Sequence, residues 1–110
     1  MRGVEVELGG KSRRIRYDFN AIADVEEKAA AGVVALFSED RVGLHAMRIL
    51  LWGGLKHEDK GLTIARVGSM IQEYMEAGGD LQELMDQVGQ ALQKSGLVGN
   101  VTAGEETDEG

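Results

Sequence analysis

The chain has 110 residues, a net charge of −7 and no cysteine, which suits a single domain and excludes a disulfide framework or a thiolate metal site. Four of its 19 acidic residues lie in the last six positions. The rest of the chain, with 15 acidic and 12 basic residues, has no long-range attraction for nucleic-acid phosphates. The chain shows neither the apolar stretch of a signal peptide nor a segment that could span a bilayer, so we expect a cytoplasmic protein without membrane contacts.

Apolar and polar side chains alternate on both sides of the pair Gly9-Gly10. The apolar positions of this alternation are Val4, Val6, Leu8, Ile15, Tyr17 and Phe19. A period of two on both sides of a glycine pair predicts a β-hairpin with one buried face, which must rest on helices because an isolated hairpin is marginal in water. Glu5 and Glu7 are expected to share the outer face with Arg14 and Arg16.

A helix is expected directly after the hairpin. Asp18 suits its N-cap position, and Tyr17 and Ile22 are spaced to pack against each other across that cap. Residues 31–37 are apolar but few, so we expect only a brief helical turn there.

The most apolar helix is expected between Ser38, which suits its N-cap, and Trp52. Its apolar residues cover most of the helix circumference, which is typical of a central, buried helix: Leu44, Met47, Ile49, Leu50, Leu51 and Trp52. The pair Gly53-Gly54 is expected to end this helix. Trp52, directly before the pair, is expected to be mostly buried.

Two amphipathic helices are expected in the last third of the chain. The first covers residues 63–77, with Thr63 as its N-cap, and is expected to end at Gly78-Gly79. The second covers residues 81–95, with Asp80 in the capping position.

Together these elements predict an α+β fold that is mainly α, with an N-terminal β-hairpin packed on three or four helices. Residues 1–98 are expected to form this single domain. Residues 99–110 hold mostly glycine, threonine and acidic side chains with little to bury, so they are expected to be a disordered acidic tail.

No catalytic motif, phosphate-binding loop or dinucleotide fingerprint is visible, so we expect neither an enzyme nor a cofactor. The loop His57-Glu58-Asp59 could contact a metal ion, but adjacent loop positions rarely converge on one ion. A solvated loop is the better interpretation. Glu26 and Glu27 are neighbours on a helix and do not face each other, so we interpret them as part of a solvated face.

The run from Lys11 to Arg16 carries four positive charges in six residues and would suit a small helical nucleic-acid-binding regulator of phage origin. No aromatic side chain is interleaved with the run, as it is in platforms for single strands. Arg14 and Arg16 also have glutamates to pair with across the hairpin. We therefore expect no nucleic-acid partner and keep the regulator as the alternative function.

Four side chains on or near the last two helices are candidates for partner binding: Met70, Tyr74, Met75 and Met85. Methionine adapts to irregular partners, and two antiparallel helices joined by a short turn can hold a shallow apolar groove between them. An amphipathic helix could lie in that groove, or a second copy could cover it in a weak homo-oligomer. The alternative is that these methionines fill the core.

Two stretches carry more information than composition does. One is Tyr17-Asp18-Phe19-Asn20-Ala21-Ile22 running into Val25-Glu26-Glu27-Lys28. The other runs from Arg48 through Trp52-Gly53-Gly54 to Asp59 and is followed by Leu62-Thr63 and Val67-Gly68. In order, spacing and overall size they resemble the phage tail assembly chaperones of the gene-transfer-agent type. The likeness covers residues 4 to about 78, and the last helix and tail agree only in length and character.

This resemblance implies a non-enzymatic role in phage or prophage tail assembly, in the cytoplasm of a bacterial host. Such chaperones bind the long, aggregation-prone tape measure protein, keep it soluble and help tail tube subunits polymerise around it. They are absent from the mature particle. The resemblance therefore implies the tape measure protein as partner, and the tail tube protein beside it. Exposed apolar surface together with net charge would suit this task.

Overall fold

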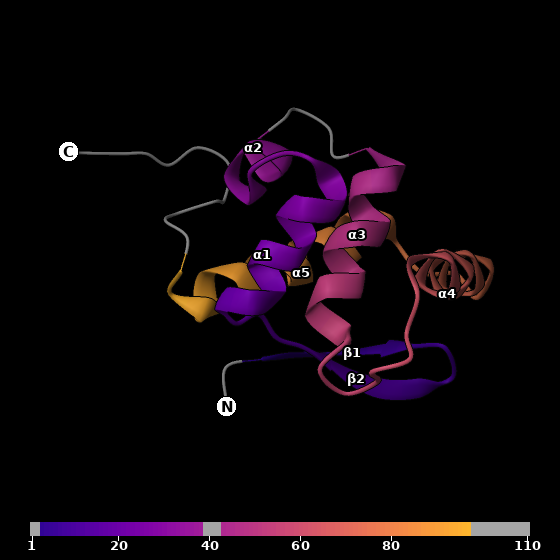
Figure 1. Cartoon of the computed structure of the whole chain (residues 1–110). Coiled ribbons are helices and arrows are strands. Elements are labelled where there is room, and N and C mark those ends of the chain that lie inside the picture. The colour runs from indigo at the N-terminus through magenta and orange to yellow at the C-terminus, as the bar shows by residue number, and fades with distance from the viewer. Residues whose placement is uncertain (1–2, 39–42, 98–110) are drawn as a thin grey trace.

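The computed structural model describes residues 3–38 and 43–97. Within these residues an antiparallel β-hairpin is followed by five helices, which confirms the mainly α, α+β fold. In Figure 1, α3 stands in the middle, with α1 and α4 on either side, the hairpin below and α5 behind. The predicted disordered tail at 99–110 lies outside the described residues.

The hairpin consists of β1 (Val4–Leu8) and β2 (Lys11–Ile15). Gly9 and Gly10 adopt φ values of 63° and 80°, as a two-residue turn with two left-handed positions requires. This tight turn places Glu5 opposite Arg14, as predicted, with 3.2 Å between the carboxylate and guanidinium. It also places Ser12 rather than Arg16 opposite Glu7, so the prediction for that second pair was wrong.

The first helix, α1 (Phe19–Ala29), begins as predicted. The Asp18 carboxylate accepts a hydrogen bond from the Ala21 amide at 2.8 Å, which satisfies one of the free N–H groups at the helix start. The brief helix expected in this region is α2 (Val33–Ser38). Phe19, assigned by its period to the buried face of the hairpin, instead opens α1 and exposes 73% of its surface.

The central helix, α3 (Leu44–Leu55), differs from its prediction at both ends. Ser38 closes α2, and α3 begins after Gly43. Gly53 and Gly54 do not end the helix but lie inside its last turn, fully buried. A Cβ at Gly53 would lie 2.2 Å from Val25 Cγ2 of α1, so the glycine lets the two helices approach.

The last two helices, α4 (Ile64–Glu76) and α5 (Leu81–Ser95), match their predicted ranges closely. Thr63 Oγ1 accepts from the Arg66 amide at 3.0 Å, and the Asp80 carboxylate accepts from the Gln82 amide at 2.9 Å. Both predicted caps are therefore confirmed. The large side chains buried almost completely come from the hairpin and four helices: Ile15, Val25, Ile49, Leu50, Leu51, Leu55, Val67, Met70, Leu84, Val88 and Leu92.

Trp52 packs against the core without being part of it. Its ring is partly exposed, with the Lys56 ammonium 5.4 Å from the ring centre. Its indole Nε1–H donates to the Leu62 carbonyl at 3.1 Å and so ties α3 to the segment before α4. Trp52 is thus mostly buried, as predicted, but it lies at the edge of the core and not at its centre, because the indole N–H needs a partner and finds it there.

Candidate functional site

A shallow apolar groove of about 230 Å³ lies between the start of α3, the second half of α4 and the first residue of α5. We call it the α3–α4 groove. Leu44 on α3 exposes 71% of its surface and Met75 on α4 exposes 45%. The groove is lined by Leu44, His45, Met47, Arg48, Gly68, Ile71, Gln72, Met75 and Leu81. Exposed apolar side chains concentrated at the seam of two helices are suited to contact another protein.

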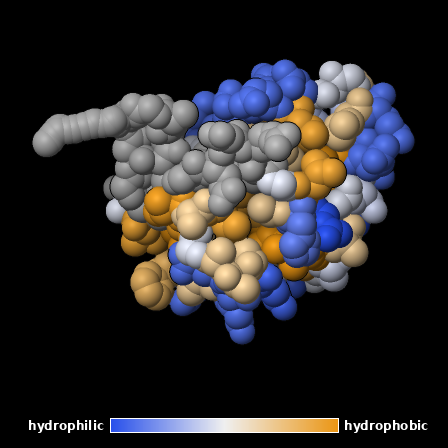
Figure 2. Space-filling view, turned by 90° about the horizontal axis from the view of Figure 1, so that it is seen from above, coloured by the Kyte–Doolittle hydropathy of each residue, from blue (hydrophilic) through white to orange (hydrophobic). Residues whose placement is uncertain are grey.

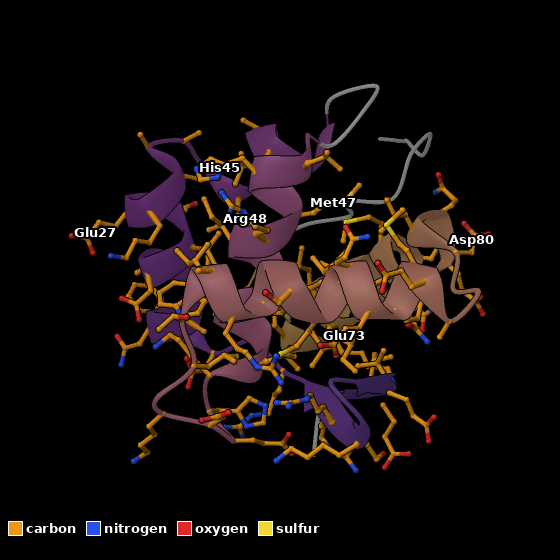
Figure 3. The ribbon with its side chains drawn as sticks, turned by 90° about the vertical axis from the view of Figure 1, so that its right-hand side faces the viewer. Glu27, His45, Met47, Arg48, Glu73 and Asp80 are labelled. Atoms are coloured by element: carbon orange, nitrogen blue, oxygen red, sulfur yellow. The ribbon has the colours of Figure 1, made fainter. Side chains whose placement is uncertain are left out.

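The floor of the groove depends on a close helix crossing. The Arg48 side chain lies flat against Gly68, where a Cβ would be only 2.9 Å from Arg48 Cδ. Its guanidinium is 2.8 Å from His45 Nδ1. In Figure 3, His45, Met47 and Arg48 lie on the part of α3 directly above α4. Because Gly68 has no side chain, the arginine stem covers α4 and leaves the apolar residues beyond it accessible.

Apolar side chains also reach the surface elsewhere. In Figure 2, seen from above, orange patches interrupt the hydrophilic surface. Phe19 on α1 and Val34 on α2 are exposed and lie outside the groove. Neither of them lines the α3–α4 groove, so they supply matched controls for experiments on it.

The four predicted partner-binding residues do not share one surface. Met70 is completely buried and Met85 nearly so, both in the core, so these two are corrected from contact residues to core filler. Tyr74 is partly buried, and its hydroxyl donates to the Asp80 carbonyl at 3.2 Å. Met75 alone lines the α3–α4 groove.

The predicted location between α4 and α5 also needs correction. α4 packs chiefly on α3 and β1, whereas α5 packs chiefly on β1 and α3. Figure 1 shows α4 end-on while α5 passes behind α3, so the two helices are not an antiparallel pair. The short turn between them permits this arrangement because a two-glycine connection sets no fixed direction for the next helix.

Sequence reasoning missed two residues of the α3–α4 groove, the exposed Leu44 and the partly buried Met47. Both were assigned to a helix that is apolar on nearly all sides, and such a helix is normally buried throughout. Their position near the start of the helix could have distinguished these two residues from the buried ones. α3 begins at Leu44, and the first turn of a central helix can project beyond the core that covers its later turns.

The loop His57-Glu58-Asp59 has a structural task. The His57 ring Nε2 lies 2.8 Å from the Arg14 carbonyl oxygen, and the Glu58 carboxylate accepts from the Arg14 amide at 3.2 Å. Asp59 lies 4.0 Å from the guanidinium of Arg13. The loop thus covers the outer edge of β2. Within residues 3–38 and 43–97, no three histidine, aspartate or glutamate side chains are grouped to hold a metal ion.

Two polar groups are buried under the hairpin. Arg13 exposes only 6% of its surface, and its Nε–H donates to the Leu8 carbonyl at 2.8 Å. The Tyr17 hydroxyl donates to the Leu50 carbonyl. Burial raises the pKa of Tyr17 far above its usual value, because the phenolate would lose its hydration. The first contact joins β2 to β1 and the second ties the end of the hairpin to α3, so both serve the fold.

Comparison with family models, curated proteins and solved structures finds no match for the chain. Among the described residues, no helix combines the length and apolar character that are required to cross a bilayer.

Proposed function

We propose that this chain is a tail assembly chaperone that binds amphipathic helices of a tape measure protein, without catalysis, in the cytoplasm of a bacterial host. The exposure of Leu44 and Met75 on opposite rims of the α3–α4 groove carries the proposal. Met47, Ile71 and Leu81 extend the apolar surface between them. A groove between two helices suits the apolar stripe of a third helix, which would contact both rims.

The polar residues of the groove indicate the kind of helix that fits. Among the described residues that line it, the polar ones are Arg48, His45 and Gln72, and none of them carries a carboxylate. A client helix whose apolar stripe is flanked by glutamate or aspartate would therefore find a cation and hydrogen-bond donors at the rim. Such a flank is common on long soluble helices, because it keeps their exposed face hydrated.

The proposed mechanism is mass action. While client helices occupy the groove, their apolar stripes are unavailable for aggregation, and the client is stabilised according to the chaperone concentration relative to the dissociation constant. Tail tube subunits would then compete for the same client surface and release the chaperone before the particle is complete. The net charge of −7 supports this role because it resists co-aggregation with the client.

The alternative, a nucleic-acid-binding regulator, depends on the arginine-rich strand. Arg13 is buried beneath the hairpin turn, and Arg14 is 3.2 Å from Glu5. These contacts support a structural role for the run. Tight and strongly salt-dependent binding to duplex DNA would favour the regulator over the chaperone.

The test is co-expression of the chain with a fragment of the tape measure protein from the same genome. The double variant Leu44→Gln/Met75→Gln removes apolar surface from both rims and leaves the core unchanged. We expect its melting temperature to remain within a few degrees of wild type, because Leu44 is mostly exposed and Met75 is nearly half exposed. Client binding should weaken by about thirtyfold or more, as for paired central contacts.

Phe19→Gln/Val34→Gln is the matched control, since both residues expose large apolar side chains outside the groove. The control should keep the client soluble. If the groove variant remains folded and solubilises the client as well as wild type does, the α3–α4 groove is not the client site. Loss of client solubility in the control alone would transfer the site to the surface of α1 and α2.

A further inference from the structure

The outer edge of β1 presents backbone groups that no described residue bonds. In an antiparallel pair, directly opposite residues alternate between those that bond each other and those whose N–H and C=O point away. The Arg14 amide and carbonyl both bond the loop at Glu58 and His57, so Arg14 points away from β1. Its partner Glu5 therefore points away from β2, and so does Glu7, two residues further along.

No group in the described part of the chain bonds these edge positions of Glu5 and Glu7. The outer edge of β2 is different, because the loop at residues 57–59 covers it. One edge of the hairpin is thus closed by the chain itself, and the other is open over at least two residues. An open edge is a template for another strand.

Space for a strand lies beside the open edge. A recess of about 310 Å³ is lined by Glu5, Val6, Glu7, Ser12, Tyr74, Glu83 and Gln87. A second recess, of about 590 Å³, continues it past Glu7 and Tyr74 to the Gly9-Gly10 turn. The two recesses share Glu7 and Tyr74 and together follow β1 from Glu5 to Gly9, about 13 Å at the rise of an extended chain.

The walls of these recesses are acidic. Of the described residues, Glu5, Glu7, Glu73 and Glu83 line them, and Lys11 is the one basic side chain that does. Glu5 is paired with Arg14, and Glu73 lies 3.9 Å from Arg66. Among the described residues, Glu7 and Glu83 have no side-chain partner. A strand bound at this edge would therefore lie between two unneutralised carboxylates, one on β1 and one on α5.

We propose that the free edge of β1 binds an extended segment of a partner protein that carries lysine or arginine at alternate positions, and that this segment forms a third strand. Residues opposite Glu5 and Glu7 would bond both backbone groups of each. Their basic side chains would lie beside the two glutamates on the outer face, where opposite charges across strands attract. Within the described part of the chain, this site shares no lining residue with the α3–α4 groove, and it does not depend on the proposed function.

A second copy of the chain fits this edge poorly. Antiparallel pairing of two β1 strands would place Glu5 of each copy beside Glu7 of the other on the same face. Like charges directly opposite in a sheet are destabilising. The Glu83 carboxylate of each copy would also remain nearby without a partner. The same glutamates that admit a basic strand thus hinder self-association through this edge.

The experiment uses the peptide acetyl-Lys-Val-Lys-Val-Lys-amide and the full chain labelled with nitrogen-15. We expect the largest amide shifts at Glu5 and Glu7 and smaller ones at Glu83 and Gln87. N-methylation of the lysine amides, which face β1, should abolish binding. N-methylation of the valine amides, which face away from β1, should leave binding unchanged. This second peptide is the control for the altered peptide backbone.

Glu7→Lys should weaken peptide binding by about fivefold, the effect of an exposed cross-strand charge, and should leave the melting temperature unchanged. Glu27→Lys is the matched control: Glu27 lies on α1, away from the hairpin (Figure 3), and its variant should bind as wild type does. Leu44→Gln/Met75→Gln should also bind the peptide normally, which separates this test from the test of the groove.

Equal loss of binding for both N-methylated peptides, or unchanged binding to Glu7→Lys, would overturn the proposal. So would peptide-induced shifts confined to the α3–α4 groove. Line broadening of the Glu5 and Glu7 amides that grows with protein concentration, without peptide, would show that a second copy occupies the edge and would overturn the assigned partner.

Discussion

Two identical dipeptides, Gly53-Gly54 and Gly78-Gly79, have opposite roles in the helical part of this protein. The first pair lies inside α3, and the second ends α4. Gly54 would place a Cβ 2.6 Å from Ile15 Cγ2, so the pair in α3 is required for contact with the hairpin and α1. Gly78 has φ of 97° and open space around its Cα, so it is required for backbone conformation.

The hydrogen bonds around the second pair show how α4 ends. The Gly78 amide donates to the Met75 carbonyl at 3.0 Å, and the Gly79 amide donates to the Tyr74 carbonyl at 2.8 Å. These are the two bonds of a Schellman motif, which needs a left-handed residue where Gly78 lies. In α3 the same dipeptide continues the helix, because each glycine costs only about 1 kcal/mol of helix propensity and close packing offsets that cost.

The largest effect is expected for Gly53→Ala. The new methyl group would collide with Val25 Cγ2, only 2.2 Å from the Cβ position, and overpacking of this kind costs about 1–3 kcal/mol. Urea denaturation measures the loss. Adding Val25→Ala should relieve part of the clash with the new methyl group. The losses of stability caused by the two substitutions should therefore be strongly non-additive. A Gly53→Ala variant as stable as wild type would contradict the close-packing role of the first pair.

A second test uses the contact of Tyr17 with Gly54, where a Cβ would lie 3.0 Å from the phenolic oxygen. Burial raises the pKa of Tyr17 in the folded state, whereas the unfolded value is about 10. The stabilisation is thus complete below pH 10 and is lost as pH rises above it, by about 1.4 kcal/mol at pH 11. In Tyr17→Phe, the free energy of unfolding from denaturant melts should fall less steeply between pH 9 and pH 11 than it does in wild type. If this pH dependence is the same in both proteins, the pKa of Tyr17 does not change on unfolding.

The smallest effect is expected for Gly78→Ala. No atom of a described residue lies within 4 Å of the added methyl group, so only the left-handed backbone opposes it, at a cost of about 1 kcal/mol. Gly78→Asn should cost less, because asparagine tolerates this conformation. Thermal melts of the two variants provide the measurement. If alanine and asparagine are equally destabilising, the requirement at Gly78 is not conformational.

The candidate site was predictable only in part. Met75 was predicted from the sequence as a candidate for partner binding, and it lies on the rim of the α3–α4 groove. Met70 belongs to the same helix but is fully buried, and helical periodicity alone does not state which neighbour covers which side. Leu44 was missed because an apolar residue at the start of a buried helix has the same sequence pattern as one in its middle.

The sequence by itself determined the features that depend on neighbouring residues. The caps at Asp18, Thr63 and Asp80 involve a side chain and an amide two or three residues away, so residue type and spacing are sufficient to predict them. The hairpin follows likewise from its alternation and its glycine turn.

Tertiary structure decided the features that depend on distant residues. The register across a two-residue turn put Arg13 on the buried face, where it bonds Leu8. The approach of α1 and β2 kept Gly53-Gly54 helical, and the direction of α4 after Leu62 placed its surface against α3 instead of α5. Each outcome depends on which distant side chains fill the same volume, and close packing across elements is not encoded in local periodicity.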